Sequence, residues 1–455
     1  MNQTSSNSSR PRLVVIGNGI TGITTARTVR KLLPNPDDVE IVIISAESDY
    51  FWSRTALMYI YMGHMRLQET EPYERHFYPR NHLDLLRDEV TEIHPDSKEI
   101  TLKAGGKLAF DYLVLALGSV SNKFGWPGQD LERVQGMYSL QDLEGIEAAS
   151  QDGIERAAII GGGLIGVELA EMFHTRHIPV TFLVREEQYM NHAFPPEEAE
   201  MIGQEILDHG IDLKLKTNLK EIQGDADGRA RGIVTEFGEE IPVQFVGLTA
   251  GVSPNITLVK DSSIETARGV VVDDYLQSSV PGIFAAGDCA QFRDQEGFPG
   301  KIYPLWYTGK HQGEALGRVL AERITGREGG FDAKPWNPGI WYNSAKFFTL
   351  EWQTYGFVPN KLEPEQTFFW RHPTERKAIR IVWEGQGTNT KITGFNVLGI
   401  RYRHEVCERW LREERPVEYV VDHLPEANFD PEFFTRHEKD FQKAFRARKK
   451  TAGAA

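Results

Sequence analysis

Short apolar runs alternate with longer mixed stretches along most of the chain. The clearest runs are 12–16, 40–44, 112–116, 157–160 and 180–184. A continuous aliphatic run of this length predicts a strand that is buried on both faces, as in a parallel sheet. The stretches between the paired runs are long enough for a helix. Strand, helix and strand in succession predict βαβ units and therefore an α/β fold.

The last part of the chain shows a second pattern, in which aromatic and aliphatic residues alternate with polar ones. The alternation is clearest over 339–358, 366–383 and 391–402. It predicts antiparallel strands. A helical stretch over 403–415 follows, so we expect an antiparallel sheet backed by a helix.

Two glycine-rich turns follow the apolar runs that end at 16 and 160, and each fits G-x-G-x-x-G between a strand and a helix. In this motif the first Gly makes a tight turn, the second lets the backbone approach a pyrophosphate, and the third lets the helix pack on the strand. The free N–H groups of the helix N-terminus then favour the negative charge. Two such turns predict that one chain holds two dinucleotides. The glycines are Gly17, Gly19 and Gly22 in the first turn, and Gly161, Gly163 and Gly166 in the second.

A third motif indicates which nucleotides these are. Residues 282–290 are typical of a buried strand that ends in Gly287-Asp288, and an Asp at such a strand end can bond a polyol such as the ribityl chain of a flavin. The order of the three motifs resembles the pyridine nucleotide-disulfide oxidoreductase superfamily, over about residues 12–400. The resemblance implies that the first turn and Gly287-Asp288 bind FAD, and that the second turn binds NADH or NADPH.

The fold class that we predict is α/β, with two Rossmann-like dinucleotide-binding domains and an α+β C-terminal domain. The NAD(P) domain interrupts the FAD domain, and the turn-rich crossovers at Gly118 and Gly251 are expected to contact the cofactors. The expected parts, in chain order, are a disordered lead-in at 1–11, the FAD-binding domain at 12–120 and 248–327, the NAD(P)-binding domain at 121–247, the C-terminal interface domain at 331–430 and a basic tail at 431–455.

Glu47 and Arg54 stand just past the second apolar run. A carboxylate there can accept hydrogen bonds from the adenosine ribose of FAD, or it can cap the segment that follows. The Glu-x6-Arg spacing is similar to rubredoxin and ferredoxin reductases, and the resemblance implies that the pair brackets the adenosine end of FAD. A solvated Arg54 is the alternative.

The segment after Arg54, residues 55–63, contains no cysteine. Superfamily members that use thiol chemistry have one or two cysteines here, and disulfide exchange needs a thiolate as its nucleophile. We therefore expect no redox-active disulfide. The resemblance implies a lysine near the flavin in iron–sulfur and rubredoxin reductases, whereas this sequence has Tyr59 at about that place.

On the nicotinamide side, Glu168 follows the second turn by two residues. The resemblance places this Glu beside the nicotinamide amide; a carboxylate favoured by the helix dipole is the alternative. Arg185 ends the next strand and could accept the 2′-phosphate of NADPH, whereas an acid there would favour NADH. The adjacent Glu186 leaves both nucleotides open.

Trp306 belongs to a segment that resembles the ferredoxin-reductase group, in which a helix N-terminus points at the flavin pyrimidine. Our catalytic candidates are therefore Glu168, Tyr59 and Trp306. Three residues of the third region are candidates for a wall that faces the electron acceptor, or alternatively for core aromatics and their neighbours. They are Trp341, Tyr342 and Lys346.

Composition excludes several classes of protein. The net charge of −14 argues against nucleic acid as the main partner. No apolar stretch approaches the ~20 residues that a membrane-spanning helix needs. The two cysteines, Cys289 and Cys407, are too few for a disulfide framework, which fits the cytoplasm. We assign no metal site.

The tail at 431–455 is basic, and Phe434, Phe441 and Phe445 would share one face of a helix. A basic amphipathic helix can bind a membrane surface. Residues 431–450 could thus hold the protein at the inner face of the membrane, as the resemblance to type II NADH dehydrogenases implies. Docking of the phenylalanines on their own domain is the alternative.

The sequence thus predicts an FAD-dependent NAD(P)H oxidoreductase without a redox-active disulfide. The first-choice electron acceptor is a rubredoxin- or ferredoxin-like protein. The alternatives are a quinone at the membrane surface, and a slow redox-sensing flavoprotein that acts as a binding module. The sheet in the third region is compatible with a homodimer.

Overall fold

The computed structural model describes residues 10–293, 300–387, 389–430, 432 and 435–452. The chain forms two compact units. The first unit comprises 1–122, 136–152 and 251–338. The second unit comprises 123–135, 153–250 and 339–455.

The first unit is built on a five-stranded sheet whose order is β19-β7-β1-β2-β3 and whose neighbouring strands are all parallel. Its strands are β1 (Arg12–Ile16), β2 (Glu40–Ser45), β3 (Asp84–Arg87), β7 (Tyr112–Leu115) and β19 (Ile283–Ala285). Strand β19 pairs with β7 although the second glycine turn lies between them in the sequence. The predicted interruption of one dinucleotide-binding fold by another is therefore confirmed.

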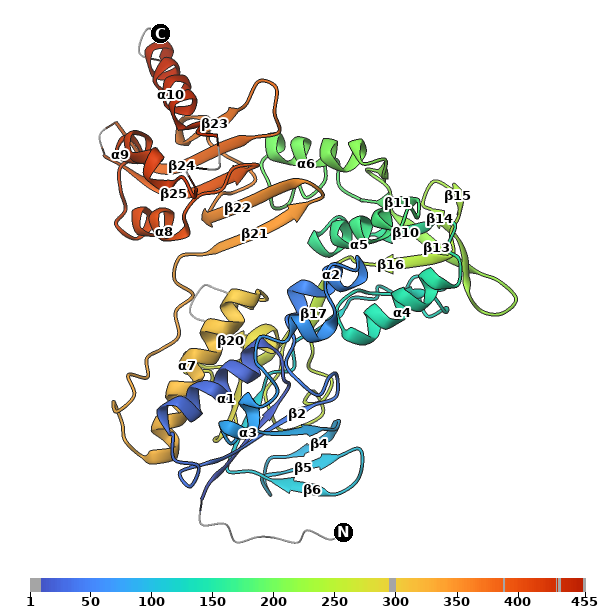
Figure 1. The fold of residues 1–455 in the computed structure, drawn as a ribbon, viewed down its shortest axis with the longest axis vertical. Helices are drawn as coiled ribbons and strands as arrows, with labels where there is room; N and C mark the ends of the chain where they lie inside the picture. The colour runs from blue at the N-terminus through green and yellow to red at the C-terminus, as the bar shows by residue number, and fades with distance from the viewer. Residues whose placement is uncertain (1–9, 294–299, 388, 431, 433–434, 453–455) are drawn as a thin grey trace. The chain divides into compact units, whose positions relative to one another are not determined.

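Two helices, α1 (Ile20–Leu32) and α7 (Trp306–Thr325), pack closely side by side in this unit (Figure 1). Three residues spaced four apart on one face of α7, at 309, 313 and 317, are glycines. A Cβ at Gly313 would lie 2.7 Å from the carbonyl oxygen of Thr21, and one at Gly317 would lie 2.5 Å from the Cβ of Thr28. The glycines therefore let the two helix backbones approach each other. In the sequence, this close contact is marked by the spacing Gly309-x3-Gly313-x3-Gly317.

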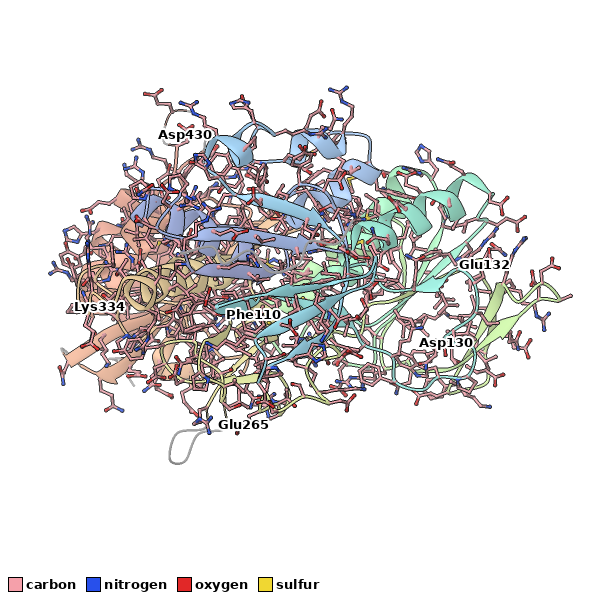
Figure 2. All side chains as sticks on the ribbon, turned by 90° about the horizontal axis from the view of Figure 1, so that it is seen from below. Phe110, Asp130, Glu132, Glu265, Lys334 and Asp430 are labelled. Atoms are coloured by element: carbon pink, nitrogen blue, oxygen red, sulfur yellow. The ribbon has the colours of Figure 1, made fainter. Side chains whose placement is uncertain are left out.

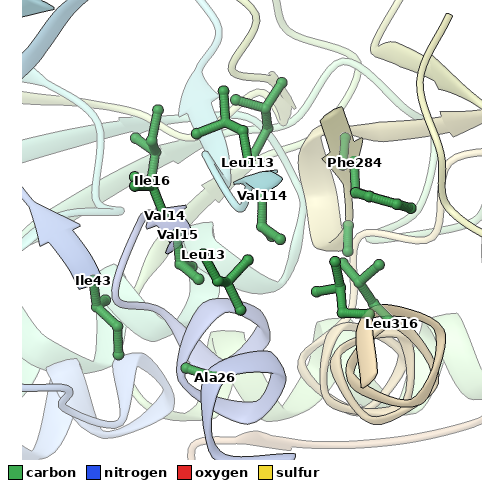
Figure 3. Packing of buried hydrophobic residues seen from close by; sticks show 14 of the residues in the cluster. Leu13, Val14, Val15, Ile16, Ala26, Ile43, Leu113, Val114, Phe284 and Leu316 are labelled. Atoms are coloured by element: carbon green, nitrogen blue, oxygen red, sulfur yellow. The ribbon is translucent and has the colours of Figure 1, made fainter. Parts of the chain in front are cut away.

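The core of the first unit lies between its parallel sheet and these helices. Figure 3 shows Val15 of β1, Val114 of β7 and Phe284 of β19 near Ala26 of α1 and Leu316 of α7. These side chains are fully or almost fully buried. Continuous aliphatic runs in the sequence thus become strands with both faces covered.

Smaller elements complete the first unit. A three-stranded antiparallel sheet is formed by β4 (Val90–His94), β5 (Glu99–Leu102) and β6 (Lys107–Ala109). Two strand pairs are β8 (Ser119–Ser121) with β17 (Val252–Pro254), and β18 (Val270–Val272) with β20 (Ala290–Phe292). The shorter helices are α2 (Leu57–Tyr61), α3 (Phe77–Arg80) and α4 (Leu140–Gln151).

Phe110, just before β7, is buried, whereas Glu265 and Lys334 project outward from the same unit (Figure 2).

The second unit contains another parallel sheet, in the order β12-β11-β10-β16-β9. Its strands are β9 (Val134–Gln135), β10 (Ala157–Ile160), β11 (Val180–Leu183), β12 (Asp212–Lys214) and β16 (Phe245–Leu248). Its helices are α5 (Leu164–Thr175) and α6 (Pro196–Asp208). An antiparallel sheet of β13 (Leu219–Gly224), β14 (Ala230–Thr235) and β15 (Glu240–Pro242) accompanies it.

The C-terminal part of the second unit is an antiparallel sheet in the order β21-β22-β25-β24-β23, as the alternating pattern predicts. Its strands are β21 (Tyr342–Phe347), β22 (Leu350–Gly356), β23 (Thr367–Arg371), β24 (Ala378–Gln386) and β25 (Asn389–Leu398). The helices that follow are α8 (His404–Arg412), α9 (Val417–His423) and α10 (Glu438–Ala452).

A buried ion pair joins this antiparallel sheet to α6. Arg380 donates to both carboxylate oxygens of Glu198, over 2.6 and 2.9 Å, and the exposed fractions of the two side chains are 2% and 0%. Glu197 accepts a further bond from Arg380 over 2.7 Å. An ion pair that is buried this deeply requires both partners, because either charge alone would be strongly unfavourable.

Within the basic tail, residues 438–452 form helix α10. The side chains of Phe441 and Phe445 are buried in the C-terminal part of the second unit, with their rings 5.2 Å from that of Phe368. The third phenylalanine of the expected face, Phe434, lies outside the described residues. Among the helices that are described, none is long and apolar enough to cross a membrane.

Candidate cofactor sites

The first glycine turn has a distinct environment at each of its three glycines. Gly17 has a φ of +108°, and a Cβ there would lie 2.1 Å from the carbonyl oxygen of Ala116. A Cβ at Gly22 would lie 2.0 Å from the carbonyl oxygen of Gly17. At Gly19, by contrast, no heavy atom of the described residues lies within 4 Å of that position. Two glycines are thus required by packing, and the middle one faces open space.

The start of α1 beside this turn offers unpaired polar groups. Both amide atoms of the buried Asn18 side chain lack a hydrogen-bond partner among the described residues. Within the same residues, no side chain caps the N-terminus of α1. Open space at Gly19, uncapped N–H groups and a buried polar side chain fit a bound pyrophosphate.

The second glycine turn repeats the pattern. Gly161 has a φ of +113°, and a Cβ there would lie 2.6 Å from the Cα of Ala250. A Cβ at Gly166 would lie 2.5 Å from the carbonyl oxygen of Gly161, whereas at Gly163 the nearest heavy atom, the carbonyl oxygen of Thr249, is 3.9 Å away. The two turns therefore have the same arrangement: the first and third glycines are closely packed, and the space beside the middle glycine is open.

Glu47 and Arg54 form a bidentate ion pair in the first unit. The two guanidinium nitrogens donate to the two carboxylate oxygens over 2.8 and 2.6 Å, and the backbone N–H of Leu140 donates to Glu47 over 3.0 Å. Glu47 therefore holds the first residue of α4. The guanidinium of Arg54 also lies over two rings, 4.5 Å from the ring centre of Tyr138 and 5.1 Å from that of Trp52.

Asp288 lies at the end of the same sheet as the first turn, and one oxygen of its carboxylate is hydrogen-bonded to both Tyr138 and Ser119. The Asp288 carboxylate accepts hydrogen bonds from the Ser119 hydroxyl over 3.1 Å and from the Tyr138 hydroxyl over 3.3 Å. Burial raises the pKa of Asp288. Burial and the Asp288 carboxylate together raise the pKa of Tyr138 to about 12. Tyr138 thus joins the predicted FAD residues.

Tyr138 was not among the sequence candidates, because no motif marks it. Its hydroxyl accepts a hydrogen bond from the backbone N–H of Ser119 over 2.9 Å, and a Cβ at Gly118 would lie 2.8 Å from that oxygen. Gly251, the other crossover glycine, has a φ of +93°, and its carbonyl accepts a bond from the N–H of Asn122 over 3.1 Å. Both crossover glycines thus lie in the first unit.

Trp306 and Tyr59 also belong to the first unit. Trp306 is the first residue of α7, and its indole N–H is buried without a hydrogen-bond partner in the described part of the chain. Tyr59 lies on α2, half-buried, with its ring 6.0 Å from that of His64. Helix α7 passes close to Asp288. A Cβ at Gly309, in its first turn, would lie 4.0 Å from the Cα of Gly287, and Gly287 donates its N–H to Gln312, in its second turn, over 2.6 Å.

Glu168 and Arg185, the candidates for the nicotinamide nucleotide, both lie in the second unit. Glu168 is in α5, where burial and the nearby Glu171 carboxylate raise its pKa to about 7. Arg185 follows β11; its side chain is 76% exposed and pairs with Glu186 over 2.8 Å. This pairing leaves the choice between NADH and NADPH open, as the sequence does.

Both cysteines of the sequence are described, and neither forms a disulfide. Cys289 is fully buried, and its thiol donates to the carbonyl oxygen of Leu115 over 3.3 Å. Burial raises the pKa of Cys289 to about 11 and that of Cys407 further. A thiol in such surroundings stays protonated and is a poor nucleophile.

The fold and the two glycine turns define a chain with two dinucleotide-binding folds. The pyridine nucleotide-disulphide oxidoreductase family matches residues 11–313, and the chain belongs to that family. Members of this family bind FAD and NAD(P)H. The predicted family, fold class and cofactors are confirmed.

Similar proteins include nitrite reductase [NAD(P)H] of Bacillus subtilis, which is 28% identical over 385 residues. That match covers 84% of this chain but only 44% of the relative. Rubredoxin-NAD(+) reductase of Acinetobacter baylyi is 27% identical over 322 residues, covering 69% of this chain and 79% of the relative. Among solved structures, a ferredoxin reductase of Rhodopseudomonas palustris has a TM-score of 0.73 at 21% identity, covering 85% of this chain and 91% of that one. The last likeness shows the shared fold.

Proposed function

We propose that the protein passes hydride from NAD(P)H, held at the second glycine turn, to FAD, held at the first, and then electrons to a protein electron carrier of the rubredoxin or ferredoxin kind. The observation that carries this proposal is the repeated turn geometry, in which the middle glycine alone faces open space. A flavin supplies the chemistry, since it accepts a hydride and can give up electrons singly.

In the first unit, we assign FAD to the groups around β1 and β19. The N–H groups at the start of α1 would meet its pyrophosphate. The Asp288 carboxylate, now bonded by Ser119 and Tyr138, would accept bonds from the ribityl hydroxyls. Arg54 and Glu47 would flank the adenosine end, and the uncapped start of α7 at Trp306 would favour negative charge on the reduced flavin.

In the second unit, we assign the nicotinamide nucleotide to the start of α5. The turn around Gly163 would hold the pyrophosphate, Glu168 would orient the nicotinamide amide, and Arg185 would lie near the adenosine ribose. Hydride transfer depends mainly on alignment, so these residues act by positioning the nucleotide.

A protein carrier is the acceptor that the observations favour. The buried, protonated cysteines argue against a thiol step between flavin and acceptor. The similar proteins include a rubredoxin reductase, and the neighbouring fold is that of a ferredoxin reductase. A quinone at the membrane surface has less support, because Phe441 and Phe445 are packed inside the C-terminal domain.

The test begins with the visible spectrum of the purified protein and anaerobic titration with NADH and, separately, NADPH. We expect the bands of oxidised flavin to bleach at a lower concentration of one nucleotide, which identifies the preferred donor. Turnover is then compared with rubredoxin, a [2Fe–2S] ferredoxin and a short-chain quinone, each with and without anionic vesicles. Flavin that neither nucleotide reduces would contradict the proposal. Fast turnover only with quinone and vesicles would replace the carrier by a membrane acceptor.

The same purified protein tests two alternatives, namely a slow redox-sensing flavoprotein and a homodimer. Fast turnover with any carrier eliminates a sensor that turns over slowly. Sedimentation of the oxidised and the NAD(P)H-reduced protein then tests for a dimer and for its dependence on the redox state.

A further inference from the structure

The side chain of Tyr138 contacts two of the groups that we assign to FAD in the first unit. Its hydroxyl lies 3.3 Å from Oδ2 of Asp288, the carboxylate that we assign to the ribityl chain. The guanidinium of Arg54, which we assign to the adenosine end, lies over its ring, 4.5 Å from the ring centre. One side chain therefore joins two parts of the site that are far apart in the sequence.

The Tyr138 hydroxyl has a defined direction, because it accepts one hydrogen bond and donates another. The backbone N–H of Ser119 donates to the hydroxyl oxygen over 2.9 Å, and the hydroxyl donates to Oδ2 of Asp288. The Ser119 hydroxyl donates to the same Oδ2 over 3.1 Å. Within the described part of the chain, Oδ1 of Asp288 has no hydrogen-bond donor. The two donors therefore hold the carboxylate by one oxygen and leave the other available to a ligand.

The ring of Tyr138 helps to hold Arg54. The guanidinium also lies over the ring of Trp52, 5.1 Å from its centre, and donates to the carbonyl oxygen of Tyr138. A guanidinium is attracted to the face of an aromatic ring. Arg54 in turn donates to both carboxylate oxygens of Glu47, over 2.8 and 2.6 Å. The two rings therefore stabilise the position of the ion pair at the adenosine end.

The start of α4 fixes the backbone of Tyr138. The backbone N–H groups of Tyr138 and Ser139 donate to one carboxylate oxygen of Asp142, over 2.8 Å each. The N–H of Asp142 donates back to the Ser139 hydroxyl over 3.1 Å. Reciprocal bonds of this kind form a capping box, which stabilises the first turn of a helix. The side chain of Tyr138 therefore extends from a rigid position.

We propose that Tyr138 is a positioning residue for FAD with two separate effects: its hydroxyl orients Asp288 towards the ribityl chain, and its ring holds Arg54 at the adenosine end. The inference rests on the proposed function, which places FAD at these residues. A group that is already held in its binding orientation loses less freedom when the ligand binds, so the affinity is higher. Tyr138→Phe removes the first effect alone, whereas Tyr138→Leu removes both.

The expected losses of affinity follow from the usual strengths of these contacts. Tyr138→Phe should weaken FAD binding by about 5-fold, which corresponds to the typical net contribution of one hydrogen bond. Tyr138→Leu should weaken it by a further factor of about 2 to 5, which is the usual range for a cation–π contact at a partly exposed site.

The experiment titrates each apoprotein with FAD by flavin fluorescence and measures its melting temperature by circular dichroism. Two double-mutant comparisons test the two effects separately. In an Asp288→Ala background, Tyr138→Phe should cause no further loss of affinity, since the hydroxyl acts through Asp288. In an Arg54→Met background, Tyr138→Phe and Tyr138→Leu should bind FAD equally well, since the ring acts through Arg54.

The matched control is Tyr78→Phe in the same unit. The Tyr78 hydroxyl likewise accepts a hydrogen bond from a backbone N–H, that of Phe51, over 3.2 Å. Tyr78→Phe and Tyr138→Phe each leave a backbone N–H without its partner, so both should lower the melting temperature of the apoprotein. Only Tyr138→Phe should weaken FAD binding, because only its hydroxyl donates to Asp288. A purely structural role of Tyr138 would not produce this difference.

The outcomes separate this inference from the proposed function. If the wild type binds FAD and Tyr138→Phe binds it equally well, or loses the same factor without Asp288, the role of the hydroxyl is overturned. Equal affinities of Tyr138→Phe and Tyr138→Leu, or a difference that persists in Arg54→Met, overturn the role of the ring. An equal loss in Tyr78→Phe overturns both roles. A wild-type protein that binds no FAD overturns the proposed function itself, and the inference with it.

Discussion

Adding one methyl group at each middle glycine should separate the two cofactor sites. Gly19 has a φ of −83° and a ψ of −176°, and Gly163 has a φ of −103° and a ψ of −177°, so alanine fits both backbones. No described heavy atom lies within 4 Å of a Cβ at Gly19, and the nearest to one at Gly163 is 3.9 Å away. Gly19→Ala and Gly163→Ala should therefore fold like the wild type.

The methyl group occupies the space that each pyrophosphate needs in our assignment. Forcing one extra carbon into a filled site costs about 1–3 kcal/mol. That cost corresponds to a dissociation constant that is about 5- to 160-fold weaker. Gly19→Ala should weaken FAD by this factor and leave the intrinsic affinity for NAD(P)⁺ unchanged, and Gly163→Ala should do the reverse.

The assay titrates apoprotein with FAD by flavin fluorescence and FAD-saturated protein with NAD(P)⁺ by calorimetry, with circular dichroism melting as the folding control. Gly22→Ala is the contrasting variant, since its Cβ would lie 2.0 Å from a carbonyl oxygen and should impair folding. The reasoning is refuted if Gly19→Ala keeps wild-type FAD affinity. It is refuted equally if both variants weaken both ligands to the same extent.

Three further predictions concern packing, buried charge and thiols. Gly313→Ala should destabilise the first unit by about 1–3 kcal/mol through overpacking against α1, as measured by urea unfolding. The control is Gly203→Ala in α6, where the position of the new Cβ is open; it should stabilise α6 by up to about 1 kcal/mol. Arg380→Met should lower the free energy of unfolding by about 3–5 kcal/mol, because it leaves the Glu198 carboxylate buried without its partner. The double variant Arg380→Met/Glu198→Leu should recover most of that loss in the same unfolding assay. A double variant that is no more stable than Arg380→Met would contradict this reasoning. Neither cysteine should react with iodoacetamide in the native protein, whereas both should react after unfolding, as mass spectrometry can show.

The agreement between sequence and structure is best where the local pattern is unambiguous. The run at 12–16 became β1, the G-x-G-x-x-G turns lie between strand and helix, and the alternating third region became an antiparallel sheet. Tyr138 was missed because its role depends on Asp288 and Ser119, which are distant in sequence. The sequence could not distinguish packing of Phe441 and Phe445 inside the protein from contact with a membrane, because both would use the same apolar face of the helix.

The sequence by itself determined the two dinucleotide folds, their nesting and the family, since apolar runs and glycine spacing act over a few residues. Only the tertiary structure decided which long-range partners meet. Glu47 pairs with Arg54 while holding α4, Arg380 buries its charge against Glu198, and Lys346 reaches Glu171. Such pairings depend on how strands and helices are brought together by burial of apolar surface, and a carboxylate's position in the sequence does not specify which cation it will meet.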